Sequence, residues 1–207
     1  MAKALSRSIR NSIKSQVKKD KDLLVQTRLI IEKQFKRVKD EMIKDFEGHA
    51  VTRELKAGPS GSNVSHTLPD GNLYGFIGFE EGVDPISPIS KLLQNTSIFI
   101  KGRKMGMSGF IWTYIVTIPT LQELYASTPM PWSKGASWLR EIEGRGIPNL
   151  GQYMYKSTSA SRSDAGFQNK NKSGGGVVRV PYIKEILSKF EDNLNSVEAS
   201  RVSAKYF

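Results

Sequence analysis

Residues 24–46 read LVQTRLIIEKQFKRVKDEMIKDF, and the spacing of their apolar side chains decides the fold. These side chains recur three, four or seven positions apart, which puts them on one stripe of an α-helix. The stripe consists of Leu24, Ile31, Phe35, Val38, Met42 and Phe46. Residues 1–58 contain no proline, and the first glycine is Gly48. We therefore expect one long helix over about Ala4–Glu47, with a bend near Lys18–Asp22 and an end at Gly48.

The segment before this stretch is basic and has an apolar stripe of its own. Residues 1–19 hold six lysines and arginines and no acid. Their apolar residues repeat every four positions, as Leu5, Ile9, Ile13 and Val17. Such a segment suits DNA phosphates, an acidic membrane surface, an acidic protein face or a neighbouring subunit. We predict a basic helical extension over residues 1–22, a single domain over residues 23–207, and candidate subunit contacts at the four apolar residues.

The middle of the chain predicts a compact hairpin. Ser97–Lys101 and Phe110–Ile118 are rich in β-branched and aromatic residues, and the basic stretch Gly102–Ser108 between them predicts a loop. Both faces of the second strand are expected to be at least half-buried. Trp112 and Tyr114 share one face, so we expect both to enter the core beside Phe35 or Val38, where truncation of Trp112 to alanine costs about 3–5 kcal/mol.

Shorter elements surround this hairpin. Leu73–Phe79 predicts a strand in which Gly75 and Gly78 mark a bulge. Caps and prolines predict short helices through Leu92 or Leu93, over Leu121–Ala126 after Thr120, and through Trp138 after Ser133 or Ser137. Residues 156–176 predict a mobile loop or a hairpin tip, Val177–Val180 a strand, and the stretch from Pro181 to Val197 a closing helix. The fold class is α+β, with a long N-terminal helix packed on a small antiparallel sheet and a C-terminal helix.

Composition excludes several classes of protein. The 207 residues include 31 Lys and Arg against 20 Asp and Glu, and they contain no cysteine. The net charge of +11 favours a polyanion or an acidic protein as partner. The longest dense apolar run, Phe110–Ile118, is far shorter than the roughly 20 residues of a membrane span. We expect neither a membrane partner nor Sec-type secretion, since no apolar signal segment begins the chain.

Residues capable of catalysis are sparse. His49 and His66 are the two histidines, and neither has an acidic or histidine partner at metal-ligand spacing. Glu80, Glu81 and Asp84 are typical of a solvated loop, and no Gly-Lys-Ser/Thr phosphate loop occurs. We predict a protein without a cofactor, a metal or enzymatic activity. A nuclease or hydrolase is the class that Mg²⁺-dependent turnover would reveal.

Several stretches carry a resemblance to a known family. They are Thr52-Arg-Glu-Leu-Lys-Ala-Gly-Pro, Gly71-Asn-Leu-Tyr-Gly-Phe-Ile-Gly-Phe, Asp84-Pro-Ile-Ser-Pro-Ile, Pro131-Trp-Ser-Lys-Gly-Ala-Ser-Trp-Leu-Arg-Glu-Ile-Glu-Gly, Gly151-Gln-Tyr and Ser161-Arg-Ser. In order and character they resemble the neck or tail-completion proteins of tailed bacteriophages, over residues 30–195. The resemblance implies a structural virion protein at the head–tail junction, made in the host cytoplasm. It also implies a homo-oligomeric ring, most often of six, between connector and tail proteins and around the DNA passage.

Two basic stretches are candidate contact surfaces within such a ring. Lys101, Arg103 and Lys104 are candidate contacts to DNA in the lumen, since a short hairpin can project them into a channel. Arg162, Lys170 and Lys172 are candidate contacts to a subunit or a neighbouring ring. The alternatives are a tail-terminator ring subunit of the same phage tail and a basic DNA-binding protein, the latter favoured by charge and disfavoured by the acidic residues 48–98.

Overall fold

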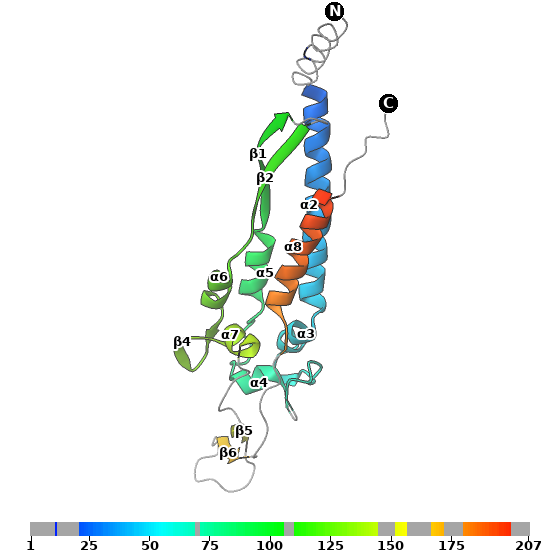
Figure 1. The fold of residues 1–207 in the computed structure, drawn as a ribbon. Coiled ribbons are helices and arrows are strands. Elements are labelled where there is room, and N and C mark those ends of the chain that lie inside the picture. Colours follow the sequence, from blue (N-terminus) through cyan, green and yellow to red (C-terminus); the bar gives the residue numbers. More distant parts are fainter. Residues whose placement is uncertain are drawn as a thin grey trace, which may run out of the picture. The chain divides into compact units, whose positions relative to one another are not determined.

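The computed structural model describes residues 11, 21–68, 71–105, 110–144, 152–156, 167–171 and 180–199. Within these ranges the chain mixes helices and short strands, which confirms the predicted fold class (Figure 1). The helices are α2 (Lys21–Gly48), α3 (Ala50–Lys56), α4 (Leu73–Ile77), α5 (Ser87–Gln94), α6 (Leu121–Ala126), α7 (Trp138–Glu143) and α8 (Ile183–Ala199), with a 3-10 turn over Gly58–Ser60. The strands are β1 (Ser97–Met105), β2 (Phe110–Thr117), β3 (Pro129–Met130), β4 (Ser133–Ser137), β5 (Gln152–Lys156) and β6 (Phe167–Asn171).

The described residues belong to two compact units. Unit 1 joins the chain up to Val38 to Ile98–Ile115, and unit 2 joins Lys39–Ser97 to the chain from Val116 onward. Helix α2 thus gives its first part to unit 1 and its last part to unit 2. The expected boundary between residues 22 and 23 stays a prediction, because residues 12–20 lie outside the described ranges.

Unit 1 contains the predicted hairpin as a two-stranded antiparallel sheet of β1 and β2. The predicted loop is wrong in its extent, because β1 continues through Gly102 to Met105. Lys101, Arg103 and Lys104 therefore lie in a strand. Alternate strand residues point to opposite faces, so a half-exposed strand accommodates charged side chains that sequence reading places in a loop.

The aromatic side chains of β2 are less buried than predicted. Trp112 and Tyr114 are half-buried, and Ile111 on the other face is 61% exposed. The expectation that Trp112 enters the core, and that both faces of β2 are at least half-buried, is therefore wrong. A two-stranded ribbon has too few neighbours in unit 1 to cover both of its faces.

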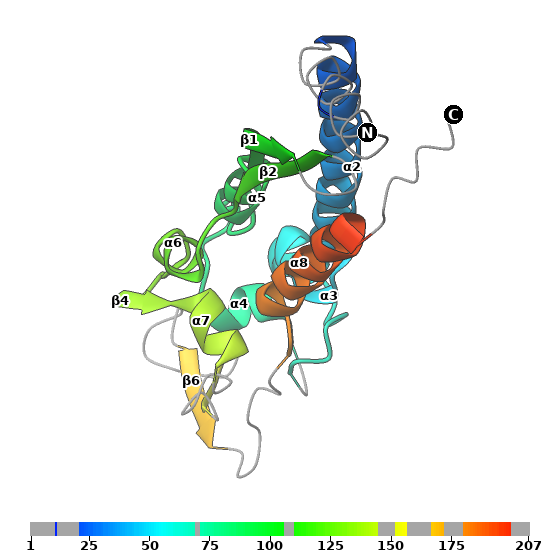
Figure 2. The same cartoon turned by 45° about the horizontal axis from the view of Figure 1, so that its top comes forward.

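The predicted stripe of α2 is confirmed over its C-terminal half. Phe35, Val38, Met42 and Phe46 are all buried. Helix α8 packs on α2, and in Figure 2 the red, C-terminal end of α8 lies beside the lower part of α2. The rings of Phe46 and Tyr182 stack with centroids 6.0 Å apart, and Lys189 Nζ lies 2.6 Å from Asp45 Oδ2.

A lysine clamp joins three elements within unit 2. Lys39 Nζ donates hydrogen bonds of 2.6 Å to the Gln94 carbonyl and 2.8 Å to the Thr96 carbonyl. These carbonyls stand at the end of α5 and just before β1. The carbonyl groups at the C-terminal end of a helix have no hydrogen-bond partner within that helix, and the clamp provides one at the end of α5.

The strand predicted over Leu73–Phe79 is wrong, since the segment forms helix α4. Asn72 Oδ1 accepts the Gly75 N–H at 2.7 Å and caps the helix, and Gly78 ends it at a φ of 87°. Glycine at a left-handed helix end is as common as glycine at a strand bulge, and periodicity over so short a run cannot separate the two. The predicted helices α5, α6 and α7 are confirmed, α6 with a capping box of Thr120 and Glu123 and α7 with Ser137 as its cap.

Within residues 152–171 the structure contains an antiparallel pair, β5 and β6, with Tyr153 opposite Lys170. Of the two alternatives predicted for residues 156–176, this pair agrees with the hairpin, although Phe167–Asn171 form a strand within the predicted tip. Strands β3 and β4 form a further small pair that we did not predict. Residues 177–179 of the predicted strand lie outside the described ranges, and Val180 is not in a strand.

Candidate functional site

Unit 1 has almost no core of its own. In the described part of the chain, only Phe35 and Val38 of the 23 buried apolar residues belong to it. Five of the seven large apolar side chains exposed there also belong to unit 1. They are Val25, Leu29, Ile30, Phe99 and Ile111, each between 43% and 61% exposed. Unit 1 thus presents an apolar surface that its own described residues do not cover.

On α2 this surface forms a ridge. Val25 and Leu29 stand four positions apart, so their side chains are neighbours on one side of the helix. The buried stripe begins at Phe35 on a different side, because six positions from Leu29 turn the helix well away from it. We call Val25 and Leu29 the apolar ridge.

A hollow of about 220 Å³ lies between α2 and β1 in unit 1. Its walls come from both elements: Arg28, Ile31, Glu32, Ile98, Phe99 and Ile100. Arg28 Nε lies 2.7 Å from Glu32 Oε1, and both side chains are exposed. Four of its six lining residues are apolar and the two charged ones pair with each other, which suits an inserted apolar side chain rather than a charged ligand.

The structure describes the three candidate DNA contacts and one of the candidate ring contacts, Lys170. Lys101, Arg103 and Lys104 lie together on β1, and the Arg103 guanidinium sits 5.9 Å from the centre of the Trp112 ring. Lys170 lies on β6 in unit 2. Candidate ring contacts outside the described residues are Leu5, Ile9, Ile13, Val17, Arg162 and Lys172.

The buried carboxylate of Glu54 organises a loop. Glu54 Oε2 accepts the Ser65 N–H at 2.9 Å, and its Oε1 accepts the Leu73 N–H at 2.6 Å. Both oxygens are thus engaged by backbone, and the side chain is fully buried. A carboxylate held in this way anchors the loop and the start of α4 rather than serving as an acid or base.

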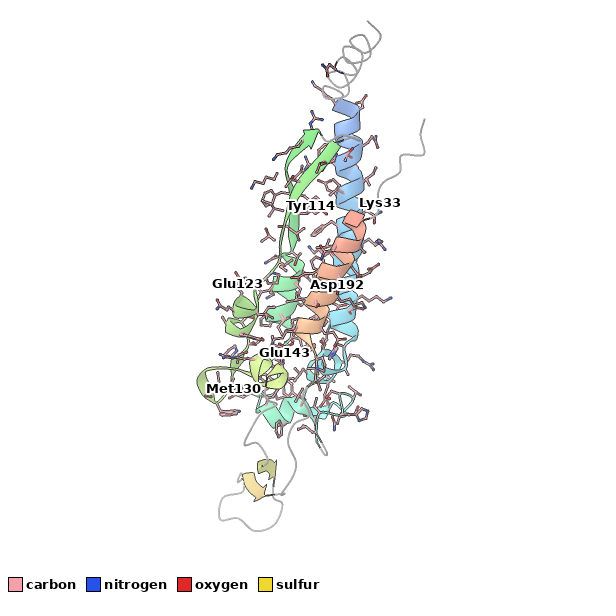
Figure 3. The ribbon with its side chains drawn as sticks, viewed as in Figure 1. Lys33, Tyr114, Glu123, Met130, Glu143 and Asp192 are labelled. Carbon is pink, nitrogen blue, oxygen red and sulfur yellow. The ribbon has the colours of Figure 1, made fainter. Side chains whose placement is uncertain are left out.

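Glu143 is a second buried carboxylate in unit 2, labelled in Figure 3. Its Oε1 accepts the Lys184 N–H at 2.8 Å, and its Oε2 accepts the Tyr125 hydroxyl at 3.1 Å. Burial raises the pKa of Glu143, and these hydrogen bonds oppose the rise. Burial and the Glu143 charge raise the pKa of Tyr125 to about 12. Glu143 therefore links α7 both to α6 and to the start of α8.

His49 caps a helix and packs against an aromatic ring. Its Nδ1 accepts the Val51 N–H at 3.3 Å and caps α3, and its ring lies 4.6 Å from that of Tyr182. Burial lowers the pKa of His49, while a hydrogen bond with the Pro181 carbonyl and the charge of Glu185 oppose the shift. The neutral ring is the form that can accept the capping hydrogen bond.

The acidic loop contributes a helix cap. Asp84 Oδ1 accepts N–H groups of Ile86 at 2.9 Å and Ser87 at 3.1 Å, and Glu80 and Glu81 are not fully buried. Among the described residues no group of three His, Asp or Glu side chains is placed to hold a metal ion. In those same residues, no helix combines the length and the apolar character that crossing a bilayer requires.

Unit 2 has a hollow of its own, of about 240 Å³. Its lining mixes both charges with apolar and hydroxyl groups: Phe46, Glu47, Lys56, Asp84, Ile86, Ser87, Ser90, Lys91 and Gln94. Asp84 is committed to its cap, and this lining includes no histidine.

Sequence reading missed the exposed apolar residues of unit 1. Val25 and Leu29 are easily taken for core residues of the long helix, because the stronger stripe through Phe35 dominates its pattern. The available signal was a second i, i+4 apolar pair on another side of the same helix, which indicates a second contact surface. Comparisons of the chain with protein-family models, with curated proteins and with solved structures gave no match.

Proposed function

We propose that this protein is a structural subunit of the head–tail junction of a tailed bacteriophage, where copies form a ring around the DNA passage. The observation that carries the proposal is the uncovered apolar surface of unit 1, including the apolar ridge, Phe99 and Ile111. Full burial of one such side chain contributes about 1.5–3 kcal/mol, so a partner that covers several of them gains substantial affinity. The phage setting comes from the resemblance of the motifs between Thr52 and Arg162.

A ring follows from the kind of surface that unit 1 offers. The apolar ridge lies on a helix, whereas Phe99 and Ile111 lie on a two-stranded ribbon. Contact between two unlike surfaces of the same chain is heterologous, and heterologous contacts generate closed rings when the rotation between copies closes. A ribbon of two strands is marginally stable alone, so each copy also gains order from its neighbour. Connector and tail proteins are the expected partners above and below the ring.

The test replaces the apolar ridge by polar residues. Val25→Gln/Leu29→Gln should leave the monomer folded, because both side chains are exposed, and should abolish incorporation into phage particles. Val83→Gln is the matched control, since Val83 is 46% exposed in unit 2. Particle incorporation is measured by quantitative mass spectrometry, and copy number by electron microscopy. Normal incorporation of the double variant, or equal loss in the control, would contradict the proposal.

The position of this subunit along the particle axis distinguishes a neck subunit from a tail-terminator subunit. A neck subunit lies between the connector and the tail, whereas a tail-terminator subunit caps the tail tube. Electron microscopy of particles that carry a tagged copy locates the subunit directly. Labelling on tails that lack heads favours the tail terminator, and labelling on heads that lack tails favours the neck.

A further inference from the structure

The net charge of the chain is confined to one unit. Unit 1 holds 14 of the 31 lysines and arginines but 3 of the 20 acids, which gives it the entire net charge of +11. Unit 2 holds 17 residues of each sign and is neutral. Charge segregated onto one small unit produces a strong local field that attracts polyanions.

Exposed lysines stand on the α2 part of unit 1. Lys33 and Lys36 lie three positions apart, so their side chains are neighbours, and both are exposed; Figure 3 marks Lys33. Arg37 follows and is exposed, with its Nε 3.3 Å from Gln34 Oε1. Glu32 is engaged with Arg28, so it does not neutralise these lysines.

The β1 part of unit 1 carries a second group of cations. Lys101 and Lys104 are both exposed, and because they are three positions apart on a strand they point to opposite faces. Arg103 shares the face of Lys101 and covers Trp112. A cation and an aromatic ring are thus in contact on this ribbon.

Nucleic acid fits this distribution better than a membrane does. A helix that lies on a membrane gathers its apolar residues on one side and its cations on the other. On α2, Leu29 and Lys33 are four positions apart and therefore share one side. Cations on the helix and on both faces of the ribbon suit a long, evenly charged polymer, and contacts to DNA phosphates require no particular bases.

We propose that unit 1 binds DNA, with Lys33 and Lys36 of α2 and with Lys101 and Lys104 on the two faces of β1 contacting backbone phosphates. The contact is independent of base sequence. The inference rests on the proposed function, which places DNA next to the protein. It adds which residues contact that DNA. DNA between copies would also relieve the repulsion among like-charged units that a ring brings together.

The test measures binding of the full chain to a 30-base-pair duplex by fluorescence anisotropy at several KCl concentrations. Removing one lysine that pairs with a phosphate should reduce the slope of log K against log [KCl] by about 0.9. We expect Lys33→Gln/Lys36→Gln and Lys101→Gln/Lys104→Gln each to lower the slope by nearly 2 and to weaken binding at least about tenfold at 0.1 M KCl. The matched control is Lys44→Gln/Lys91→Gln, which removes two exposed lysines from unit 2.

Three outcomes would overturn the inference. They are absence of duplex binding at 0.05 M KCl, equal weakening in the control, and an unchanged slope in both unit 1 variants. Vesicles of phosphatidylserine and phosphatidylcholine serve as the competing probe, and binding to them without binding to the duplex also overturns it. Circular dichroism verifies folding of every variant. A chain that enters particles without binding DNA refutes this inference alone, whereas one that binds DNA without assembling refutes the proposed function alone.

Discussion

The hydroxyl of Tyr182 lies 2.6 Å from the hydroxyl of Thr52, and both side chains are buried. Tyr182 immediately precedes α8, and Thr52 lies on α3, 130 positions earlier. Burial raises the pKa of Tyr182, so the phenol stays protonated and always has a proton for this bond. The contact ties the last helix of unit 2 to an early one.

Removal of one of the two hydroxyls should therefore destabilise the protein more than removal of both. Tyr182→Phe leaves the Thr52 hydroxyl buried without its partner, which costs about 1–3 kcal/mol. Thr52→Val should cost a similar amount, and the double variant should lose much less than the two together. Urea unfolding of the four proteins gives the coupling energy. Additive losses would mean that the two hydroxyls do not interact.

His49 should make the protein less stable as the pH becomes acidic. Burial puts the pKa of His49 in the folded protein below its ordinary value of 6.5. The unfolded chain therefore takes up the proton first, so this contribution to stability is complete above pH 6.5 and disappears as the pH falls through the lowered pKa. His49→Asn keeps a capping side chain but cannot titrate, and it should flatten the profile below pH 6.5.

Thermal unfolding between about pH 5 and 8 measures this effect. His66→Asn is the matched control, because His66 has a φ of 51°, a conformation that asparagine tolerates. The prediction fails if His49→Asn retains the full pH dependence of the wild-type protein.

Gly78 should be more sensitive to substitution than Gly82. Both have positive φ values, 87° and 89°, which cost about 1–2 kcal/mol for a residue with a Cβ atom. A Cβ on Gly78 would also lie 3.3 Å from Trp132 Cδ1, whereas a Cβ on Gly82 meets no atom within 4 Å. Gly78→Ala should therefore lose more unfolding free energy than Gly82→Ala. Equal losses in guanidinium melts would show that the Trp132 ring gives way freely.

The three tryptophans differ in burial, which gives a prediction about packing. Trp138 is 1% exposed and meets Phe79 edge to face at 6.1 Å, so Trp138→Ala should cost about 3–5 kcal/mol. Trp112 is half-buried, and its stacking with Arg103 contributes about 0.5–1 kcal/mol, so Trp112→Ala should cost less than half as much. Denaturant melts compare the two variants directly. A larger loss for Trp112→Ala would mean that the ring is a core residue after all.

Helices with a long apolar stripe or a clear capping residue could be predicted from the sequence. The buried stripe from Phe35 to Phe46, the end of α2 at Gly48 and the capping box at Thr120 all have local causes that are visible in the order of residues. The α4 segment could not be assigned, because a glycine at a left-handed helix end and one at a strand bulge leave the same mark in a short apolar run.

The candidate site was harder to predict, because exposure is a property of the assembled unit. The sequence indicated that Lys101 lies at the edge of a loop. Only the fold reveals that Lys101 belongs to strand β1 and that its side of the strand is exposed. Leu29 lies outside the predicted stripe, and only the fold reveals that the described part of unit 1 leaves it 52% exposed. Composition revealed the excess of positive charge but not its confinement to one unit, which requires knowing that residues 98–115 join the first 38.

The lysine clamp has a mechanical consequence. Lys39 is the first residue of unit 2, and Thr96 stands next to the last residue before the chain enters unit 1 again. The backbone passes between the two units at three places, after Val38, after Ser97 and after Ile115, and a single ammonium group holds the first two of these segments together. An ammonium group has three rotatable donors, so these hydrogen bonds can re-form after a small displacement of the two segments. A contact with fixed geometry would be lost. Lys39→Met would uncouple these two segments, and under tension they would then yield one at a time.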